Sequence, residues 1–293
     1  MTEIPKKILL GEKIPYPKRY APEILVPLPR NINRESISIE TNNLPFVGVD
    51  VWHAYEFSFL TNYGLPVAGI IKMVVPADSP FLVESKSLKL YLNSFNMERY
   101  GNNSKEGVLI ILNTIRNDLN KILKTDIKIS YFEYQNKVFR FDFSDYLILE
   151  NNLDGEIIEY KDFNEKPELL ISEISSQREI KFATHLIRTN CKITQQPDWG
   201  SAYIYMKGTK TPSKDCLLKY LVSMRNENHF HEEICEMIYQ RLNFFFAPDD
   251  LMVTCIYSRR GGIDICPTRA SSSELLPKYL SECNQLSYKL LRQ

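Results

Sequence analysis

The feature that most constrains the fold is a change of hydrophobic period along the first half of the chain. Residues 47–75 are rich in β-branched and aromatic residues, and the turn-forming run Asn62-Tyr63-Gly64 interrupts them, which predicts two paired strands. Apolar residues then recur every three or four positions up to about Lys124, which predicts a helix with Ser104 as its cap. Strands are expected again at 127–134 and near 138–143.

The second half of the chain shows the same order of elements. We expect strands at 181–193 and 200–207, helices at about 214–225 and 231–245, a hairpin of 252–258 with 262–265 across Arg259-Arg260-Gly261, and a C-terminal helix from Ser272. The two halves have no close sequence repeat. Their common order of elements nevertheless predicts an α+β protein with antiparallel sheets and helices packed on one face.

Proline-rich and acidic segments indicate where the domains begin and end. Residues 1–45 carry many prolines without sustained periodicity, so we expect an extended arm that packs on the rest of the protein. Residues 151–167 are acidic and polar, and we interpret them as a linker. The chain is therefore expected to divide into an N-terminal domain at 46–150 and a C-terminal domain at 168–293.

The charge balance limits the partners of the chain. Its 293 residues include 36 Lys and Arg and 36 Asp and Glu, so direct binding of nucleic acid, a polyanion, is not expected. The first residues lack the apolar core of a signal peptide, and no apolar run approaches the roughly 20 residues that span a bilayer. We therefore expect a cytoplasmic protein without membrane contact.

The cysteines and histidines do not follow the spacing of a metal site. The 6 cysteines all lie in the C-terminal half without a Cys-x-x-Cys pair, and the 4 histidines form no His-Glu-x-x-His pattern, so we expect neither a disulfide framework nor a metal. About four or five of the cysteines should be buried as small apolar residues. Neither Gly-x-Gly-x-x-Gly nor a Walker loop occurs, which argues against a Rossmann or P-loop nucleotide site.

One cysteine stands in a run of residues suited to chemistry. In Asn190-Cys191-Lys192-Ile193-Thr194-Gln195-Gln196-Pro197-Asp198-Trp199-Gly200, an acid follows Cys191 by seven residues, so the loop can fold Asp198 back toward the sulfur. A thiolate nucleophile and an acid that exchanges protons are what addition to an electrophilic carbon requires. From the residues alone, a buried structural Cys191 and a turn residue Asp198 are the more common alternative.

Three further segments combine charge with turns or helix starts. Residues 83–91 contain an acid, hydroxyls and lysines, which could bind phosphates or form a solvated, helix-capping segment. Phe230-His231-Glu232-Glu233 opens a helix, where Glu232 could complement the helix dipole or accept hydrogen bonds from a purine. Arg259-Arg260-Gly261-Gly262, at a hairpin tip, suits either an anion or an ordinary solvated turn.

Together the four segments resemble the signatures of the 7-cyano-7-deazaguanine reductase family, in its long form with two tandem tunnelling-fold domains. Glu84-Ser85-Lys86-Ser87-Leu88-Lys89-Leu90-Tyr91-Leu92-Asn93-Ser94-Phe95-Asn96 is similar to the family's cofactor-site motif, and Cys191 through Gly200 is similar to its catalytic loop. Phe230-His231-Glu232 and Arg259-Arg260-Gly261-Gly262 complete the pattern in the expected order. Cys266 departs from it, because asparagine is expected there.

The resemblance implies an NADPH-dependent nitrile reductase of queuosine biosynthesis, a tRNA-modification pathway, that acts as a homodimer. Cys191 would attack the nitrile of 7-cyano-7-deazaguanine to form a thioimide, Asp198 would supply protons, and two hydrides from NADPH would complete a four-electron reduction. The resemblance implies that the substrate-binding residues are Val83, Glu84, Ser85, Phe230, His231 and Glu232, and that the cofactor-binding residues are Ser85, Lys86, Arg260 and Gly261.

Three other functions share some of these features. A relative that adds ammonia to the nitrile of a modified tRNA base would be an amidinotransferase, but Glu84-Ser85-Lys86, Arg260-Gly261 and the neutral charge favour NADPH chemistry. A zinc-dependent pterin- or GTP-processing enzyme of the same fold would need histidine ligands that these motifs lack. An unreactive Cys191 would instead indicate a non-catalytic purine-binding protein.

Overall fold

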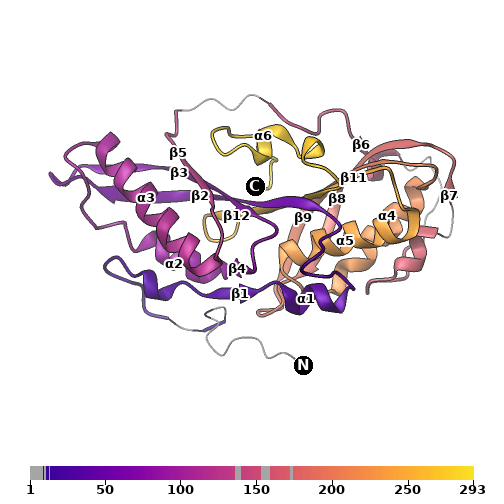
Figure 1. Cartoon of the computed structure of the whole chain (residues 1–293), viewed down its shortest axis with the longest axis horizontal. Helices are drawn as coiled ribbons and strands as arrows, with labels where there is room; N and C mark the ends of the chain where they lie inside the picture. Colours follow the sequence, from indigo (N-terminus) through magenta and orange to yellow (C-terminus); the bar gives the residue numbers. More distant parts are fainter. Residues whose placement is uncertain (1–8, 10, 13, 136–139, 153–158, 172–173) are drawn as a thin grey trace.

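The structure, a computed structural model, describes residues 9, 11–12, 14–135, 140–152, 159–171 and 174–293. Its main element is an eight-stranded sheet with the order β5-β3-β2-β12-β11-β9-β8-β6, antiparallel except between β6 and β8 (Figure 1). The strands are β2 (Val47–Leu60), β3 (Pro66–Pro76), β5 (Lys128–Phe132), β6 (Leu147–Ile148), β8 (Glu179–Asn190), β9 (Pro197–Lys207), β11 (Asp250–Tyr257) and β12 (Ile263–Ala270).

Four longer helices cover one face of this sheet. They are α2 (Ser85–Asn93), α3 (Ser104–Leu123), α4 (Lys214–Ser223) and α5 (His231–Phe246). Figure 1 shows them below the sheet, whereas the short α6 (Lys278–Ser281) and the C-terminal segment lie above it. The remaining elements are short: η1 (Pro22–Ile24), β1 (Pro27–Pro29), α1 (Asn31–Ser36), β4 (Phe81–Val83), η2 (Leu149–Asn152), η3 (Pro167–Ile171), β7 (Ile174–Ser175), β10 (Thr211–Pro212), η4 (Met224–Asn226) and η5 (Ser273–Leu275).

The predicted α+β class is confirmed, because antiparallel strands form the sheet and the longer helices pack on one of its faces. Each half places a strand hairpin before two helices, β2–β3 before α2 and α3, and β8–β9 before α4 and α5. β12 pairs with β2 from Ile263↔Ala54 to Ala270↔Val47, so the two halves share one sheet. The domain division at residues 151–167 stays a prediction, and 153–158 lie outside the described residues.

The helix predicted from the apolar period near Lys124 is α3. It begins at Ser104, which is not the cap: the N-cap is Asn103, whose side chain accepts a hydrogen bond from Glu106 N at 3.0 Å. The predicted cap is wrong by one residue, because Asn103 and Ser104 are both residue types that suit an N-cap. The helix buries the apolar residues that recur every four positions, namely Ile111, Ile115, Leu119 and Leu123.

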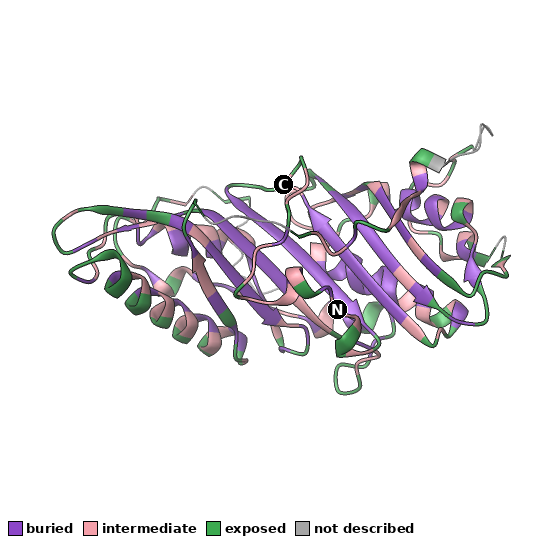
Figure 2. Ribbon diagram, turned by 90° about the horizontal axis from the view of Figure 1, so that it is seen from above, coloured by how far each residue is buried: buried purple, intermediate pink, exposed green. Residues whose placement is uncertain are grey.

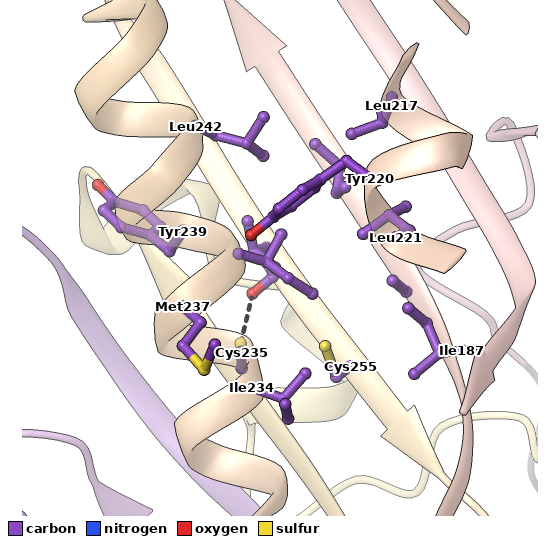
Figure 3. Packing of buried hydrophobic residues seen from close by; sticks show 14 of the residues in the cluster. Ile187, Leu217, Tyr220, Leu221, Ile234, Cys235, Met237, Tyr239, Leu242 and Cys255 are labelled. Carbon is purple, nitrogen blue, oxygen red and sulfur yellow. Dashed lines mark hydrogen bonds between the residues drawn. The ribbon is translucent and has the colours of Figure 1, made fainter. Parts of the chain in front are cut away.

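The core lies on both sides of the central strands. Figure 2 shows β11 and β12 buried along almost their whole length, because helices cover one face of the sheet and the C-terminal segment covers the other. In Figure 3, side chains of α4 and α5 pack against Ile187 of β8 and Cys255 of β11. Four cysteines are buried and two, Cys191 and Cys283, are half-buried, which confirms the expected burial of four or five.

The C-terminal segment differs from the prediction. In place of a helix from Ser272, only η5 and α6 form, because Pro277 has no N–H group with which to continue a helix. The segment is instead fastened to β3 by Lys72, which is buried. The Lys72 Nζ donates to the carbonyl oxygens of Tyr279 at 3.1 Å, Glu282 at 2.8 Å and Gln285 at 2.7 Å.

Two other segments also differ from the sequence-based expectation. The N-terminal arm is not extended throughout, since it contains η1, β1 and α1, and β1 pairs with β4. Residues 140–143 form no strand: the Asp142 carboxylate there accepts hydrogen bonds from Tyr279 N and Leu280 N, both at 2.9 Å. Residues 138–139 of that predicted strand lie outside the described residues. Over the ranges described, no helix has the length and apolar character needed to cross a membrane.

Candidate active site

A cavity lies where the two halves of the chain meet. It has a volume of about 250 Å³, and its walls come from β1, β4, the start of α2, the β8–β9 loop, the start of α5 and the β11–β12 turn. The cavity is lined by every residue predicted for the site, namely Val83, Glu84, Ser85, Lys86, Cys191, Asp198, Phe230, His231, Glu232, Arg260 and Gly261. The structure thus brings together four segments that are far apart in the sequence, and the role of each residue remains a prediction.

Cys191 lies directly after β8, in the loop that leads into β9. Two backbone hydrogen bonds close this loop, from Cys191 N to Gln196 O at 2.8 Å and from Gln195 N to Cys191 O at 3.0 Å. Gln195 has a φ of 55°, a left-handed conformation that lets the chain reverse in few residues. Thr189 pairs with Asp198 across the hairpin, and Cys191 follows Thr189 by two residues. The sulfur comes from the loop directly after β8 and the carboxyl group from β9, the strand paired with β8, and both residues line the cavity.

Asp198 is 4% exposed and is contacted by two side chains. Arg260 Nε lies 2.8 Å from Asp198 Oδ1, and His231 Nε2 lies 3.4 Å from Asp198 Oδ2. The His231 ring stacks on Tyr257, with ring centroids 3.8 Å apart and planes inclined by 6°. A buried carboxyl group held in this way is oriented to exchange a proton with a group in the cavity. Arg260, predicted to bind the cofactor, thus also contacts the predicted proton-transfer residue.

The start of α5 is held beside Cys191 by a short additional pairing at the end of β8. His229 N donates a hydrogen bond to Asn190 O at 3.1 Å, directly before the helix begins. Phe230 is the N-cap, and its N–H group donates to the Glu233 carboxylate at 3.1 Å. This capping explains why a charged helix start occurs here, and it brings the first turn of α5 to the cavity.

Glu232, in that first turn, is 4% exposed although it lines the cavity. Burial, and secondly the carboxylate of Asp50, raises the pKa of Glu232 to about 8. A carboxyl group with this pKa holds its proton in a large share of molecules at neutral pH. It will ionise more readily once a ligand presents N–H donors to it.

The N-terminal arm forms part of the cavity wall next to Glu84. Glu84 is 1% exposed and caps α2, since its Oε2 accepts a hydrogen bond from Ser87 N at 2.5 Å. Glu84 N donates to Val26 O at 2.9 Å, and Val26 N donates to Ser87 Oγ at 3.1 Å. Leu28, two residues further along the arm, lines the cavity. The arm therefore fixes the segment that carries Glu84.

Cationic side chains line the same cavity. Lys86 and Lys89 lie one turn apart on α2, and Arg260 lies in the β11–β12 turn. Gly261 has a φ of 56°, a backbone conformation that favours glycine. Several cations around one cavity suit the phosphate groups of a dinucleotide, so the residues present fit a phosphate-bearing cofactor.

Sequence reasoning assigned no role to several lining residues. Three of them lie inside the predicted motifs, and this could have identified them as site residues: Lys89, Thr194 and Gln196. The others carry no chemical signature and come to the cavity only through strand pairing and helix placement; they are Leu28, Trp52, Leu82, His229, Ile263 and Ile265.

A second buried polar group lies away from the cavity, under the C-terminal segment. The ligand atoms of His53, Asp264 and Cys266 lie within 4.8 Å of one another, an arrangement that could hold a metal ion. Lys289 Nζ, however, lies 3.1 Å from His53 Nδ1 and 3.7 Å from Asp264 Oδ2, so an ammonium group already offsets the carboxylate charge. The expectation that the protein uses no metal stays a prediction.

The fold and the cavity define the class of the protein. It is an α+β protein with two halves of similar element order, whose cavity joins a cysteine, a buried acid and several cations. A family model described as "Nitrile reductase, 7-cyano-7-deazaguanine-reductase N-term" matches residues 16–131, and one described as "QueF-like protein" matches residues 197–275.

Known relatives match the chain over nearly all of its length. The chain is 38% identical over 287 residues to an "NADPH-dependent 7-cyano-7-deazaguanine reductase" of Colwellia psychrerythraea, with 94% of this chain and 95% of the relative covered. It is 40% identical over 272 residues to a protein of the same name from Rickettsia massiliae, with 90% and 92% covered. The chain therefore belongs to the family of NADPH-dependent 7-cyano-7-deazaguanine reductases, as its motifs predicted.

A solved structure described as "Crystal structure of the archaeosine synthase QueF-Like in the apo form" is 15% identical to the chain. It covers 33% of this chain and 95% of its own, with a TM-score of 0.30.

Proposed function

We propose that this protein reduces the nitrile of 7-cyano-7-deazaguanine to the aminomethyl group of 7-aminomethyl-7-deazaguanine, with two equivalents of NADPH. The step would serve queuosine biosynthesis in the cytoplasm, through a homodimer that does not itself bind nucleic acid. The observation that carries the proposal is that Cys191 and Asp198 share one cavity with two buried glutamates and a group of cations.

Covalent capture of the nitrile is the role proposed for Cys191. Its sulfur adds to the nitrile carbon, so a C–S bond forms and the thiol proton is transferred to the nitrile nitrogen, which gives a thioimide. Asp198 mediates this transfer, because its carboxylate can accept the thiol proton and then deliver it to nitrogen. The contacts of Asp198 with Arg260 and His231 keep the carboxyl group oriented for both steps.

Recognition of the base is the role proposed for Glu84 and Glu232. Both are buried at the cavity and offer carboxylate oxygens that can accept hydrogen bonds from the N–H groups of a deazaguanine. Phe230 and His231 shape the same wall, and Val83 and Ser85 lie beside Glu84. Buried acceptors of this kind select against ligands that lack matching donors, since an unpaired buried carboxylate is costly.

The cations are proposed to hold the cofactor. Lys86 and Arg260, with Ser85 and Gly261, would contact its phosphate and ribose groups at the cavity. When bound, NADPH supplies a hydride to the carbon of the captured nitrile. Asp198 would supply the matching proton to nitrogen in each of the two reductions. After the first of them the nitrogen lone pair forms a C=N bond while the C–S bond breaks, and the sulfur leaves with its electron pair. A proton from nitrogen, transferred through Asp198, restores the Cys191 thiol, so the second reduction acts on an imine.

Mass spectrometry and NADPH absorbance test this proposal. Protein mixed with 7-cyano-7-deazaguanine alone should gain the whole mass of the substrate on the peptide that carries Cys191, and NADPH should be consumed only when the substrate is present. Cys191→Ala should lose both signals. Cys283→Ala is the matched control, because Cys283 is the other half-buried cysteine and should retain both. Labelling at another cysteine, or no NADPH consumption, would contradict the proposal.

A further inference from the structure

A buried network of charged residues lies between the sheet and α5, close to Glu232. It joins the N-terminal arm, β2, α5 and β12, and each member is at most 4% exposed. The members are Arg30, Arg34, Asp50, Glu236 and Arg269. The network therefore contains three guanidinium groups and two carboxylates, all removed from solvent.

The network has two branches that meet at Arg269. On one branch, Asp50 accepts from Arg30 Nη2 at 2.6 Å and from Arg269 Nη1 at 2.8 Å. On the other, Glu236 Oε1 accepts from Arg269 Nη2 at 2.9 Å and from Arg34 Nη2 at 2.7 Å. Arg30 and Arg34 thus occupy matched positions. Both belong to the N-terminal arm of the chain, and each pairs with a different carboxylate.

The Asp50 branch of the network lies beside the wall of the cavity that Glu232 lines. Asp50 and Trp52 are two residues apart on β2, so their side chains lie on the same face of the strand, and Trp52 lines the cavity with Glu232. Arg30 follows Leu28, another lining residue, by two positions. Because this region is dry, charges act over longer distances than they do in water. The charged and titratable groups on the elements around Glu232 are Arg30, Asp50, Arg269, His231, Glu233, Glu236, Glu84, Asp198, His229, Lys86, Lys89 and Arg260.

We propose that Arg30 is a positioning residue for base recognition: its pairing with Asp50 offsets the negative charge near Glu232 and so keeps Glu232 able to accept hydrogen bonds from the base. This inference rests on the proposed function, in which Glu232 binds the base. It gives the N-terminal arm a role in substrate affinity, in addition to its contact with the Glu84 segment.

The directions of the pKa shifts agree with this geometry. Burial alone would raise the pKa of Asp50, but Arg269 and Arg30 lower it, so Asp50 remains a carboxylate. Burial and then Asp50 raise the pKa of Glu232, while Arg30 and Arg269 oppose the increase. Loss of Arg30 would leave Asp50 less compensated, and Glu232 would then hold its proton to a higher pH.

The test measures substrate affinity against pH in protein that carries Cys191→Ala, so that only non-covalent binding of 7-cyano-7-deazaguanine is observed. In calorimetry, Arg30→Met should move the pH midpoint of binding upward and weaken binding at pH 7 by about tenfold, the loss expected from removing one nearby opposite charge. Arg30→Lys should restore most of the affinity. Arg34→Met is the matched control: it should lower stability but leave the midpoint in place, because Arg34 pairs with Glu236.

A substitution at Asp50 distinguishes an effect of charge from a loss of folding. Asp50→Asn removes the charge that disfavours ionisation of Glu232, so it should move the midpoint downward, which a merely structural loss would not do. It also provides the test if Arg30→Met does not fold. Equal shifts in the Arg30 and Arg34 variants, or an unchanged midpoint in both Arg30→Met and Asp50→Asn, would overturn the inference. No binding of the substrate at any pH by the Cys191→Ala parent would instead contradict the proposed function.

Discussion

Arg260 is expected to have two roles, to bind the cofactor and to orient Asp198. Its Nε contacts the Asp198 carboxylate at 2.8 Å, and its guanidinium also donates to the carbonyl of Pro197. The side chain is 40% exposed, so this ion pair alone contributes little to stability. The pair instead orients the buried carboxyl group of Asp198, and the same guanidinium group can also bind a phosphate.

Arg260→Ala should therefore impair two measurable steps. Cofactor affinity should weaken by about 1–3 kcal/mol, as expected for the loss of a charge-assisted contact, and adduct formation at Cys191 should slow severalfold because Asp198 loses its orienting partner. Lys89→Ala is the control, since it removes a cavity cation that lies on α2, whereas Asp198 pairs with Arg260 and His231; it should affect the cofactor alone. Stopped-flow adduct kinetics without NADPH distinguish the two variants. An unchanged adduct rate in Arg260→Ala would show that the pairing has no catalytic consequence.

The two carboxyl roles can be separated by isosteric substitution. Asp198→Asn keeps the size of the side chain but cannot exchange protons, so adduct formation and reduction should both fall while non-covalent binding survives. Glu232→Gln should weaken substrate binding itself, by about 1–3 kcal/mol. Calorimetry and adduct kinetics on both variants give the comparison. The assignment fails if Asp198→Asn loses binding but forms the adduct at the wild-type rate when saturated.

The pKa of Glu232 also predicts how stability depends on pH. The folded protein holds this proton up to a pKa of about 8, whereas the unfolded chain releases it near 4.5, so this residue's contribution to stability is lost as pH rises between those values. Glu232→Gln does not titrate. Its unfolding free energy relative to wild type should therefore increase across that window, by about 5 kcal/mol in total. Urea denaturation at about pH 5 and about pH 8.5 measures the change, and a pH-independent difference would argue against the raised pKa.

At the scale of elements, a buried lysine helps to fasten the C-terminal segment to the sheet. The Lys72 ammonium donates to three carbonyl oxygens of this segment, and the carbonyl of Lys72 accepts from Cys283 Sγ at 3.6 Å. Burial, and then the charge of Lys289, lowers the pKa of Lys72 to about 8. Three hydrogen bonds between the segment and the sheet therefore depend on the Lys72 side chain.

Lys72→Met should release this segment while it leaves the cavity side of the sheet intact. We expect a loss of about 2–4 kcal/mol in unfolding free energy, from three carbonyls left without their donor. Cys283 should also react faster with a thiol reagent, whereas Cys191 should react at its wild-type rate. Peptide mapping after brief labelling checks both cysteines. Equal protection of Cys283 in variant and wild type would contradict the proposed anchoring.

Elements with a strong period were predictable from the sequence, and those governed by tertiary contacts were not. The pattern around Ile111 and Ile115 predicted α3 because burial of one helical face demands it. The predicted C-terminal helix does not form across Pro277, and Lys72 and Asp142 supply hydrogen bonds to the segment in addition to those of its own short turns. Site residues with chemical side chains, such as Cys191, were found through motifs. Trp52 was not, because only the pairing of β2 with β12 places it in the cavity.

At the scale of the whole molecule, the β2–β12 pairing joins both halves in one sheet and sets the cavity at their junction. Gly48 lies within this pairing, and a Cβ atom there would come within 2.3 Å of Thr268 O, which leaves no room for a larger residue. A shared sheet of this kind should make the two halves unfold together.

The 2 tryptophans allow a direct test of this coupling, since Trp52 lies in the N-terminal half and Trp199 in the C-terminal half. Trp199→Phe and Trp52→Phe each leave one fluorescent reporter. In guanidinium titrations, each reporter should give the same midpoint as the circular dichroism of its own variant, which is the mark of a single transition. A reporter that changes well before the secondary structure would show that the halves unfold separately.

The position of β12 also has a consequence for how the chain is made. β12 leaves the ribosome after every other strand of this sheet, yet it lies at the centre of the sheet beside β2, with contacts such as His53 to Asp264 spanning 211 residues. Until translation reaches that point, β2 has an open edge that can pair with other nascent chains. Contacts of such long range also slow folding, so newly synthesised protein should depend on chaperones until β12 has emerged.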